Sequence, residues 1–253
     1  MYKIPATTLF LGKNLIFMPE CHSTNDTLLL LCQKENLPEG TLVITSSQTA
    51  GRGQRGNVWE AEKDKNLTFS FLLKPSFLPV IKQFYLNIFV SLGIRDFLTE
   101  ITGEKVHIKW PNDILLREKK ISGILIETQL HGTRINSAIV GVGININQHQ
   151  FTIPSATSLS LIANRNFDLP YCLEKLVHAI EIRYMQLREN RLDQLRSEFV
   201  DQLFRKDVDH FFYSNGARFS GEIKGIDDIG RLLIRIGDLE KSFDIKDVKY
   251  DGF

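Results

Sequence analysis

The sequence predicts an α+β protein with a mixed, largely antiparallel sheet, helices on one face of that sheet, and a small β-barrel at the C-terminal end. Helix-type and strand-type segments alternate over most of the chain, and short turns such as "REKK" favour antiparallel pairing. The final segment, from residue 217 on, has short β-type runs divided by Gly and Asp turns, which is typical of a small barrel. At 253 residues the chain exceeds a typical domain, so we expect one domain over residues 1–206 and a second over 207–253.

The first part of the chain is expected to contain two helices and two strands. "STNDTLLLLCQKEN" (residues 23–36) predicts a helix, because Ser, Thr or Asn can cap its first turn. Runs rich in β-branched and aromatic residues predict strands at 41–47 and 66–73, with a glycine-rich loop between them. Residues 78–103 have apolar side chains at helical spacing and end at a glycine, so they predict the second helix.

The second part begins with strands and returns to helix. Residues 105–147 form a strand-rich run. Residues 169–204 have a helical pattern with many charges on one side, and we expect this helical connector to complete the first domain.

Composition excludes several classes of protein. The 31 basic and 30 acidic residues leave a net charge of +1, so no overall field attracts nucleic acid or a membrane surface. The three cysteines, Cys21, Cys32 and Cys172, make no C-x-x-C pair and indicate a reducing compartment without disulfides. The six histidines lack the spacing of a zinc site. No apolar run approaches the ~18 residues of a membrane span, so we expect a cytoplasmic protein.

The loop "TAGRGQRGNVW" (residues 49–59) matches the dinucleotide-binding pattern G-x-G-x-x-G at Gly51, Gly53 and Gly56. That pattern binds a pyrophosphate only when a helix follows immediately, with an acidic residue about 20 positions further on. Here "NVWEAEKDKN" has no helical spacing, and an apolar strand stands where the acidic residue should be. The context excludes a dinucleotide site, and the absence of G-K-[ST] excludes a P-loop.

Two arginines distinguish this loop. Arg52 and Arg55 stand among small residues, where guanidinium groups can approach a phosphate or carboxylate and bind it through two donors. The alternative is a mobile surface loop whose arginines are solvated. This loop alone does not decide between the two.

The stretch "KWPNDILLREKKISGILIE" is the second indication of a binding site. Pro111 fixes the local backbone, so Asn112 and Asp113 are expected at a turn or strand start. Lys120 ends the short turn that leads into the next strand. Gly123 leaves a gap in that strand's side-chain surface, where a ligand can come close.

The stretch "VGVGININ" is the third. Strand side chains alternate between faces, so the aliphatic residues at 140, 142, 144 and 146 share one face and must be core. The opposite face has Gly141, Gly143, Asn145 and Asn147, which make a plausible floor for a flat polar ligand. The alternative is that the glycines only relieve helix–sheet packing.

Together, Ser-Thr-Asn at 23–25, Gln48 with "AGRGQRG" and Trp59, "KWPND", "KKISGILIE" and "GVGININ" resemble the biotin–protein ligase family in order and spacing. The resemblance spans roughly residues 20–150, and "GEIKGIDDIGRLLI" is more weakly similar to that family's SH3-like C-terminal domain. It implies a biotin/lipoate ligase-like catalytic fold and a reaction in two steps. The carboxylate of biotin attacks the α-phosphate of ATP, giving biotinyl-5′-AMP and pyrophosphate, and a lysine of a biotin carboxyl carrier protein domain then takes the biotin and releases AMP. Mg²⁺ is expected to accompany the triphosphate.

The resemblance also implies a role for each matching residue. Lys120 would lie near the biotin carboxylate and the α-phosphate, with Arg52 anchoring the same region, and we hypothesise that Asp113 orients and helps deprotonate the carrier lysine. No metal ligand is assigned. The expected biotin-binding residues are Ser23, Thr24, Asn25, Gln48, Arg52, Gly53, Gln54, Lys120 and Gly123. The expected ATP- or adenylate-binding residues are Arg55, Trp59, Lys109, Asn112, Lys120, Gly143 and Asn145.

One position departs from the family pattern. Many members have G-R-G-R-x-G, with an arginine that helps to retain the adenylate, whereas this chain has Gln54 there. Either Arg55 takes over that role or the intermediate is released faster, and the sequence does not decide between these outcomes.

Three other functions are weighed against biotin ligation. Lipoate or octanoate ligation is disfavoured because the R-R-x-S-G-G-G-type loop of those families is absent. A non-catalytic biotin or adenylate sensor is disfavoured because Arg52 and Lys120 are both present, and a purely structural module would leave this set of residues a coincidence.

The expected partners follow from the same resemblance. Residues matching the family begin within about twenty positions of Met1, which leaves no room for the N-terminal DNA-binding domain of some members. We therefore expect a single-function ligase that does not bind DNA. Homodimers formed through sheet edges occur in the family, so a homodimer is a possible state that the sequence does not decide.

Overall fold

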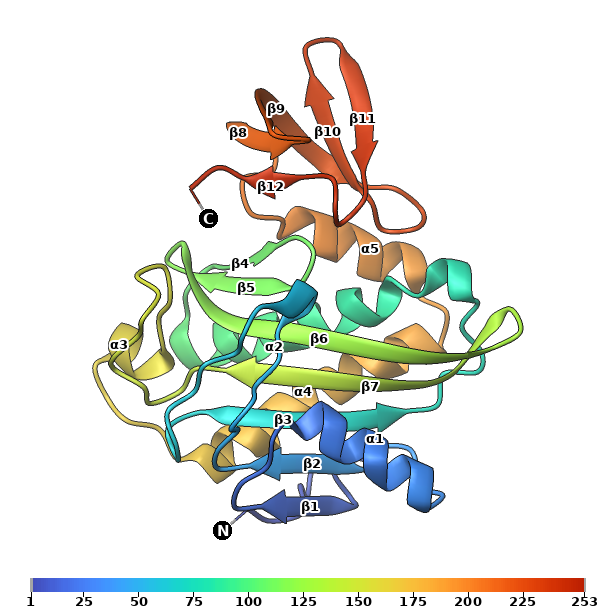
Figure 1. Cartoon of the computed structure of the whole chain (residues 1–253), viewed down its shortest axis with the longest axis vertical. Helices are drawn as coiled ribbons and strands as arrows, with labels where there is room; N and C mark the ends of the chain where they lie inside the picture. The colour runs from blue at the N-terminus through green and yellow to red at the C-terminus, as the bar shows by residue number, and fades with distance from the viewer. Residues whose placement is uncertain (1, 253) are drawn as a thin grey trace.

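The computed structural model describes residues 2–252, apart from the side chain of residue 55. A large sheet forms the body of the molecule, and a smaller sheet lies at one end of it (Figure 1). The elements are, in chain order, β1 (Leu15–Met18), α1 (Thr24–Lys34), β2 (Leu42–Thr45), η1 (Gln54–Gly56), β3 (Leu67–Leu73), η2 (Val80–Lys82), α2 (Tyr85–Thr102), β4 (Val106–Lys109), β5 (Asp113–Leu116), β6 (Lys119–His131), β7 (Arg134–Ile144), α3 (Leu159–Ala163), α4 (Leu169–Arg188), α5 (Leu192–Asp201), β8 (Asp209–Ser214), β9 (Ala217–Ile226), β10 (Leu232–Ile236), β11 (Leu239–Phe243) and β12 (Lys249–Tyr250).

The large sheet has the strand order β1-β2-β3-β7-β6-β5-β4. β1 and β2 pair in parallel, and the other neighbouring strands pair antiparallel, which confirms the predicted mixed, largely antiparallel sheet. The expected helix at 78–103 begins later, at Tyr85, after a short 3-10 turn that follows Pro79. Proline disfavours the helical conformation of the residue before it, which delays the start of the helix.

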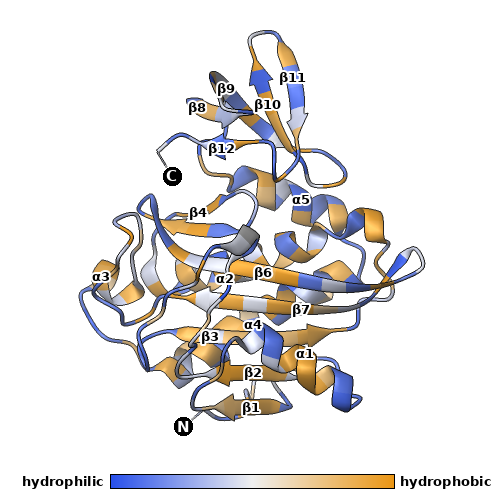
Figure 2. Ribbon diagram, viewed as in Figure 1, coloured by the Kyte–Doolittle hydropathy of each residue, from blue (hydrophilic) through white to orange (hydrophobic). Residues whose placement is uncertain are grey.

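The expectation of helices on one face is wrong for α1. α2 and α4 pack together against the face of the sheet that carries Phe69 and Phe71, whereas α1 covers β2, β3 and β7 on the other side (Figure 1). α1 has its own small apolar cluster there, which includes Leu28, Val43 and Leu72. β2 is buried on both faces and is largely hydrophobic in Figure 2, so it cannot show which face a helix covers.

The small sheet is antiparallel, in the order β11-β10-β9-β8-β12, and it agrees with the predicted SH3-like C-terminal region. It rests on the body of the molecule at Gly230, whose carbonyl oxygen accepts a 2.9 Å hydrogen bond from Nε1 of Trp110. A side chain at position 230 would overlap the ring of Phe84. The predicted domain boundary after residue 206 falls between α5 and β8 and stays a prediction. Within residues 2–252, no helix has the length and apolar character to cross a membrane.

Candidate active site

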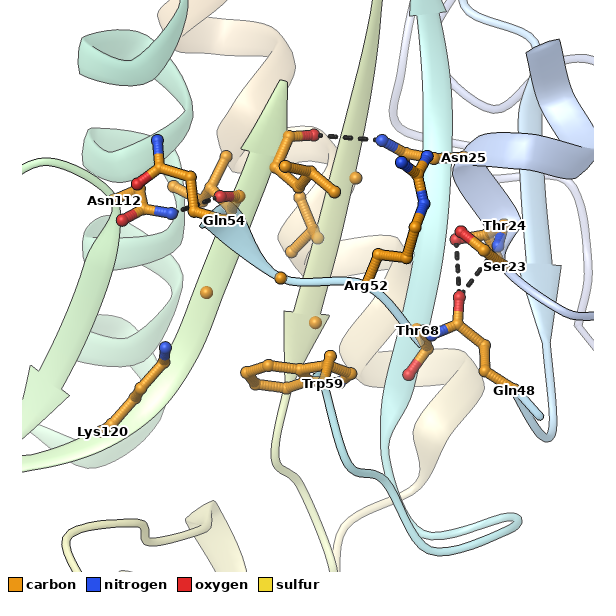
Figure 3. Close-up of a pocket in the computed structure, with 17 residues that line it drawn as sticks. Ser23, Thr24, Asn25, Gln48, Arg52, Gln54, Trp59, Thr68, Asn112 and Lys120 are labelled. Atoms are coloured by element: carbon orange, nitrogen blue, oxygen red, sulfur yellow. Dashed lines mark hydrogen bonds between the residues drawn. The ribbon is translucent and has the colours of Figure 1, made fainter. Parts of the chain in front are cut away.

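A pocket lies where the N-terminal end of α1, the glycine loop and the strands β6 and β7 meet (Figure 3). All nine residues expected to bind biotin line it, as do four of the seven expected to bind ATP or the adenylate. The lining consists of Ser23, Thr24, Asn25, Gln48, Arg52, Gly53, Gln54, Trp59, Thr68, Asn112, Lys120, Gly123, Ile124, Leu125, Gly141, Val142 and Gly143.

The floor of the pocket is a pair of glycines on adjacent strands. Gly123 of β6 lies opposite Gly143 of β7 in the strand register. The ring of Trp59 packs on both, and a Cβ at position 143 would overlap that ring. The face without side chains predicted from "VGVGININ" is therefore present at Gly143, and the ring of Trp59 lies on it.

A network of polar side chains lies at the end of the pocket next to α1. Gln48 Oε1 accepts a 2.8 Å hydrogen bond from the backbone N–H of Thr24. The hydroxyl of Ser70 is within 2.7 Å of Thr24 Oγ1 and 2.6 Å of Asn25 Oδ1. Sequence reasoning missed Ser70 and Thr68, although the alternation in "LTFSFLL" places both on one face of β3. The network offers both donors and acceptors to a ligand.

The opposite end of the pocket is cationic. Lys120 Nζ lies 2.5 Å from one carboxylate oxygen of Asp113, and Lys109 Nζ lies 3.8 Å from the other. Asp113 pairs with Lys109 across β4 and β5, which brings the three residues together. Burial lowers the pKa of Lys109; the attraction of Asp113 opposes this shift, and the charge of Lys120 adds to it.

Arg52 does not join this cationic end. Its Nη2 donates to Asp26 Oδ1 at 2.6 Å and to the two carboxylate oxygens of Glu127 at 2.9 and 3.1 Å. Figure 3 shows its side chain extending toward Asn25, away from Lys120. Arg52 and Lys120 thus line the same pocket, but two carboxylates on α1 and β6 bind the guanidinium, and the expected role of Arg52 beside Lys120 stays a prediction.

A second cavity, of about 480 Å³, adjoins the cationic end. Lys109, Asn112, Asp113 and Lys120 line it from one side, and β12 contributes Lys249 and Tyr250 from the C-terminal sheet. Lys109 Nζ lies 5.4 Å from the centroid of the Tyr250 ring. Sequence analysis assigned no site residue to the C-terminal region, since nothing in "KDVKY" indicates which surface it meets.

The structure gives a separate outcome for Asn145, Asn112 and Arg55, which were expected to bind ATP. Asn145 is buried and lines neither cavity; its Nδ2 donates to Thr157 O at 3.0 Å. β7 ends at Ile144, so the strand alternation used to place Asn145 no longer applies there. Asn112 lines both cavities, but its Nδ2 donates to Ile124 O at 2.6 Å. Arg55 falls outside the described side chains.

No metal cage is present among the described residues, which contain no group of three or more His, Cys, Asp or Glu side chains suited to a metal ion. Mg²⁺ is commonly held by substrate phosphates with one or two carboxylates. Its expected presence with the triphosphate stays a prediction.

Comparison with known proteins agrees with this geometry. The model of the biotin/lipoate A/B protein ligase family matches residues 18–145. A Bacillus subtilis protein named bifunctional ligase/repressor BirA is 32% identical over 232 residues, which are 90% of this chain and 71% of that protein. A biotin–[acetyl-CoA-carboxylase] ligase of Mycobacterium tuberculosis is 28% identical over 85% of this chain and 80% of that protein. The structure of a biotin protein ligase from Aquifex aeolicus in complex with biotin and ATP superposes with a TM-score of 0.80 at 27% identity, covering 94% of this chain and all of that one.

Proposed function

The chain belongs to the biotin/lipoate A/B protein ligase family, and we propose that it is an ATP-dependent biotin–protein ligase. It activates biotin as biotinyl-5′-AMP with release of pyrophosphate, and then transfers biotin to a protein lysine. The observation that carries this proposal is the polarity of the pocket, with a hydrogen-bonding network of uncharged side chains at the α1 end and Lys120, which shares Asp113 with Lys109, at the other. Biotin has the same polarity, because its ureido ring is neutral and its carboxylate is anionic.

The cationic end supports the activation step. The carboxylate of biotin and the α-phosphate of ATP repel each other, so their reaction requires a fixed positive charge between them. Lys120 supplies this charge in our proposal, and the 2.5 Å contact with Asp113 holds its ammonium in place. A carboxylate oxygen of biotin forms the new bond to the α-phosphorus as the bond to the pyrophosphate oxygen breaks.

In the transfer step, the amine of the acceptor lysine attacks the carbonyl carbon of the adenylate. The bond between this carbon and the anhydride oxygen breaks, and AMP leaves with its electrons. We propose that Asp113 orients this amine and accepts its proton. We propose that the acceptor is a lysine of a biotin carboxyl carrier domain and that the reaction takes place in the cytoplasm. We also propose that the protein does not bind DNA, which its near-neutral net charge of +1 supports.

The polar network favours biotin over lipoate and octanoate. The hydrocarbon tail of either acid offers no donor or acceptor to the amides of Asn25 and Gln48, which line the pocket. A hydrogen bond that a ligand makes to such a group contributes about 0.5–1.5 kcal/mol. A ureido ring offers these groups both a carbonyl acceptor and N–H donors.

The proposal is tested by exchange of labelled pyrophosphate into ATP, run separately with biotin, lipoate and octanoate. We expect exchange with biotin alone. Exchange with either other acid in place of biotin would reassign the substrate, and biotin binding without any exchange would identify a sensor instead of an enzyme.

A further inference from the structure

One arginine connects the glycine loop to the rest of the molecule through two carboxylates. Within the loop, Gly53 N donates to Asn57 O and Trp59 N donates to Gly51 O, which closes it into a small hairpin. Arg52 extends from this hairpin and binds Asp26 of α1 and Glu127 of β6. The two acids lie 26 and 75 positions from Arg52 in the sequence, so the contact joins three separate segments.

Glu127 has a second partner in the pocket. Its Oε2, which accepts from Arg52, also accepts a 2.7 Å hydrogen bond from Asn25 Nδ2. This bond directs Asn25 Oδ1 toward the hydroxyl of Ser70. Asp26 also accepts from Arg52, through Oδ1 alone, but no hydrogen bond joins its described side chain to Asn25. Only Glu127 therefore both binds Arg52 and sets the orientation of a pocket amide.

The loop held in this way nearly fills the pocket. The remaining space is about 50 Å³, whereas sites for small organic ligands typically measure about 300–1,000 Å³. The ring of Trp59 takes up the floor between Gly123 and Gly143. Entry of a ligand requires the loop to move, so whatever holds Arg52 controls that movement.

We propose that Asp26 and Glu127 form a carboxylate latch that holds the glycine loop over the pocket through Arg52, and that Glu127 couples the latch to biotin recognition by positioning Asn25. The coupling rests on the proposed function; the latch does not. The side chains of Arg52, Asp26 and Glu127 are 41%, 43% and 39% exposed, so each ion pair alone is weak, and the latch depends on two carboxylates sharing one guanidinium. Glu127 and Asp26 are positioning residues in this proposal.

Hydrogen exchange of residues 51–59 in the substrate-free protein tests the latch. We expect Glu127→Gln to lower the protection of this segment about fourfold and Asp26→Asn to lower it about twofold, in the range of partly exposed charge pairs. Glu104→Gln is the matched control, because Glu104 forms its ion pair with Arg117, outside the loop and the pocket. Raising the salt concentration should lower protection in the unmodified protein and have a smaller effect in Glu127→Gln, where Asp26 alone still pairs with Arg52. Unchanged protection in both variants would overturn the latch.

Titration calorimetry with biotin tests the coupling. We expect Glu127→Gln to raise the Kd for biotin about tenfold and Asp26→Asn to change it less than about twofold, because only Glu127 positions Asn25. Equal effects of the two variants would overturn the coupling while leaving the latch intact. If the unmodified protein does not bind biotin, the proposed function fails. The hydrogen-exchange experiment on residues 51–59 still decides whether the latch exists.

Discussion

The two ends of the pocket differ in their balance of charged residues: two carboxylates share one cation at one end, and two cations share one carboxylate at the other. At the α1 end, Arg52 is shared by Asp26 and Glu127, which leaves one negative charge in excess. At the other end, Asp113 is shared by Lys109 and Lys120, which leaves one positive charge in excess. An anion entering the pocket is therefore attracted to one end and repelled from the other. The acids around Arg52 and Lys120 therefore decide the net charge at each end of the pocket, although both residues are cationic.

Loss of Lys120 should have the largest effect on this polarity. Replacing Lys120 with Met removes the charge beside the reacting groups, and we expect biotin-dependent pyrophosphate exchange to fall about 10²–10³-fold, as when a preorganised electrostatic donor is deleted. Lys119→Met is the matched control, since Lys119 precedes it on the same strand and is exposed. An equal loss in both variants would argue against a specific role for Lys120.

Asp113→Asn tests whether the acid at the cationic end does more than hold Lys120. We expect transfer to a carrier lysine to slow about 100-fold, which is typical of a lost general base, and adenylation to slow less. Single-turnover measurements of the two half-reactions would separate them, with the exposed Glu118, in the turn after β5, changed to Gln as control. Equal losses in both half-reactions would indicate that Asp113 only positions Lys120.

Ser70→Ala affects the α1 end of the pocket alone. The change removes the hydroxyl that bonds Thr24 and Asn25, and we expect the Kd for biotin to rise about tenfold, since an unpaired buried polar group costs about 1–3 kcal/mol. The adenylation rate at saturating biotin should stay within about twofold of the unmodified rate. A fall in that rate without a change in Kd would contradict the separation of the two ends.

The smallest expected effect is a pH dependence at Lys109. Its folded pKa is lowered, mainly by burial, so it loses its positive charge at a lower pH than the ordinary lysine value of about 10.4. Because the protonated form attracts phosphates, the KM for ATP should begin to rise at a pH below the ordinary lysine pKa of about 10.4. Lys109→Arg keeps the charge and should remove this rise. A profile of KM against pH that is the same in both proteins would assign the rise to another group.

Local patterns in the sequence predicted much of the site. The alternation in "VGVGININ", the proline of "KWPND" and the glycines of the loop depend on backbone geometry over a few residues, so they could be placed without coordinates. Residues 23–25, Gln48, Lys120 and Gly123 line one pocket, as the resemblance implied. Their individual roles stay predictions.

The sequence by itself determined which residues are available at each strand face and turn, because strand alternation and backbone preference are local properties. Only the tertiary structure decided the partners of Arg52, the position of α1 on the second face of the sheet, and the approach of Lys249 and Tyr250 to the cationic end. These depend on contacts between segments distant in the chain, and the strength of a charge pair depends on separation and solvent exposure, which no local pattern contains.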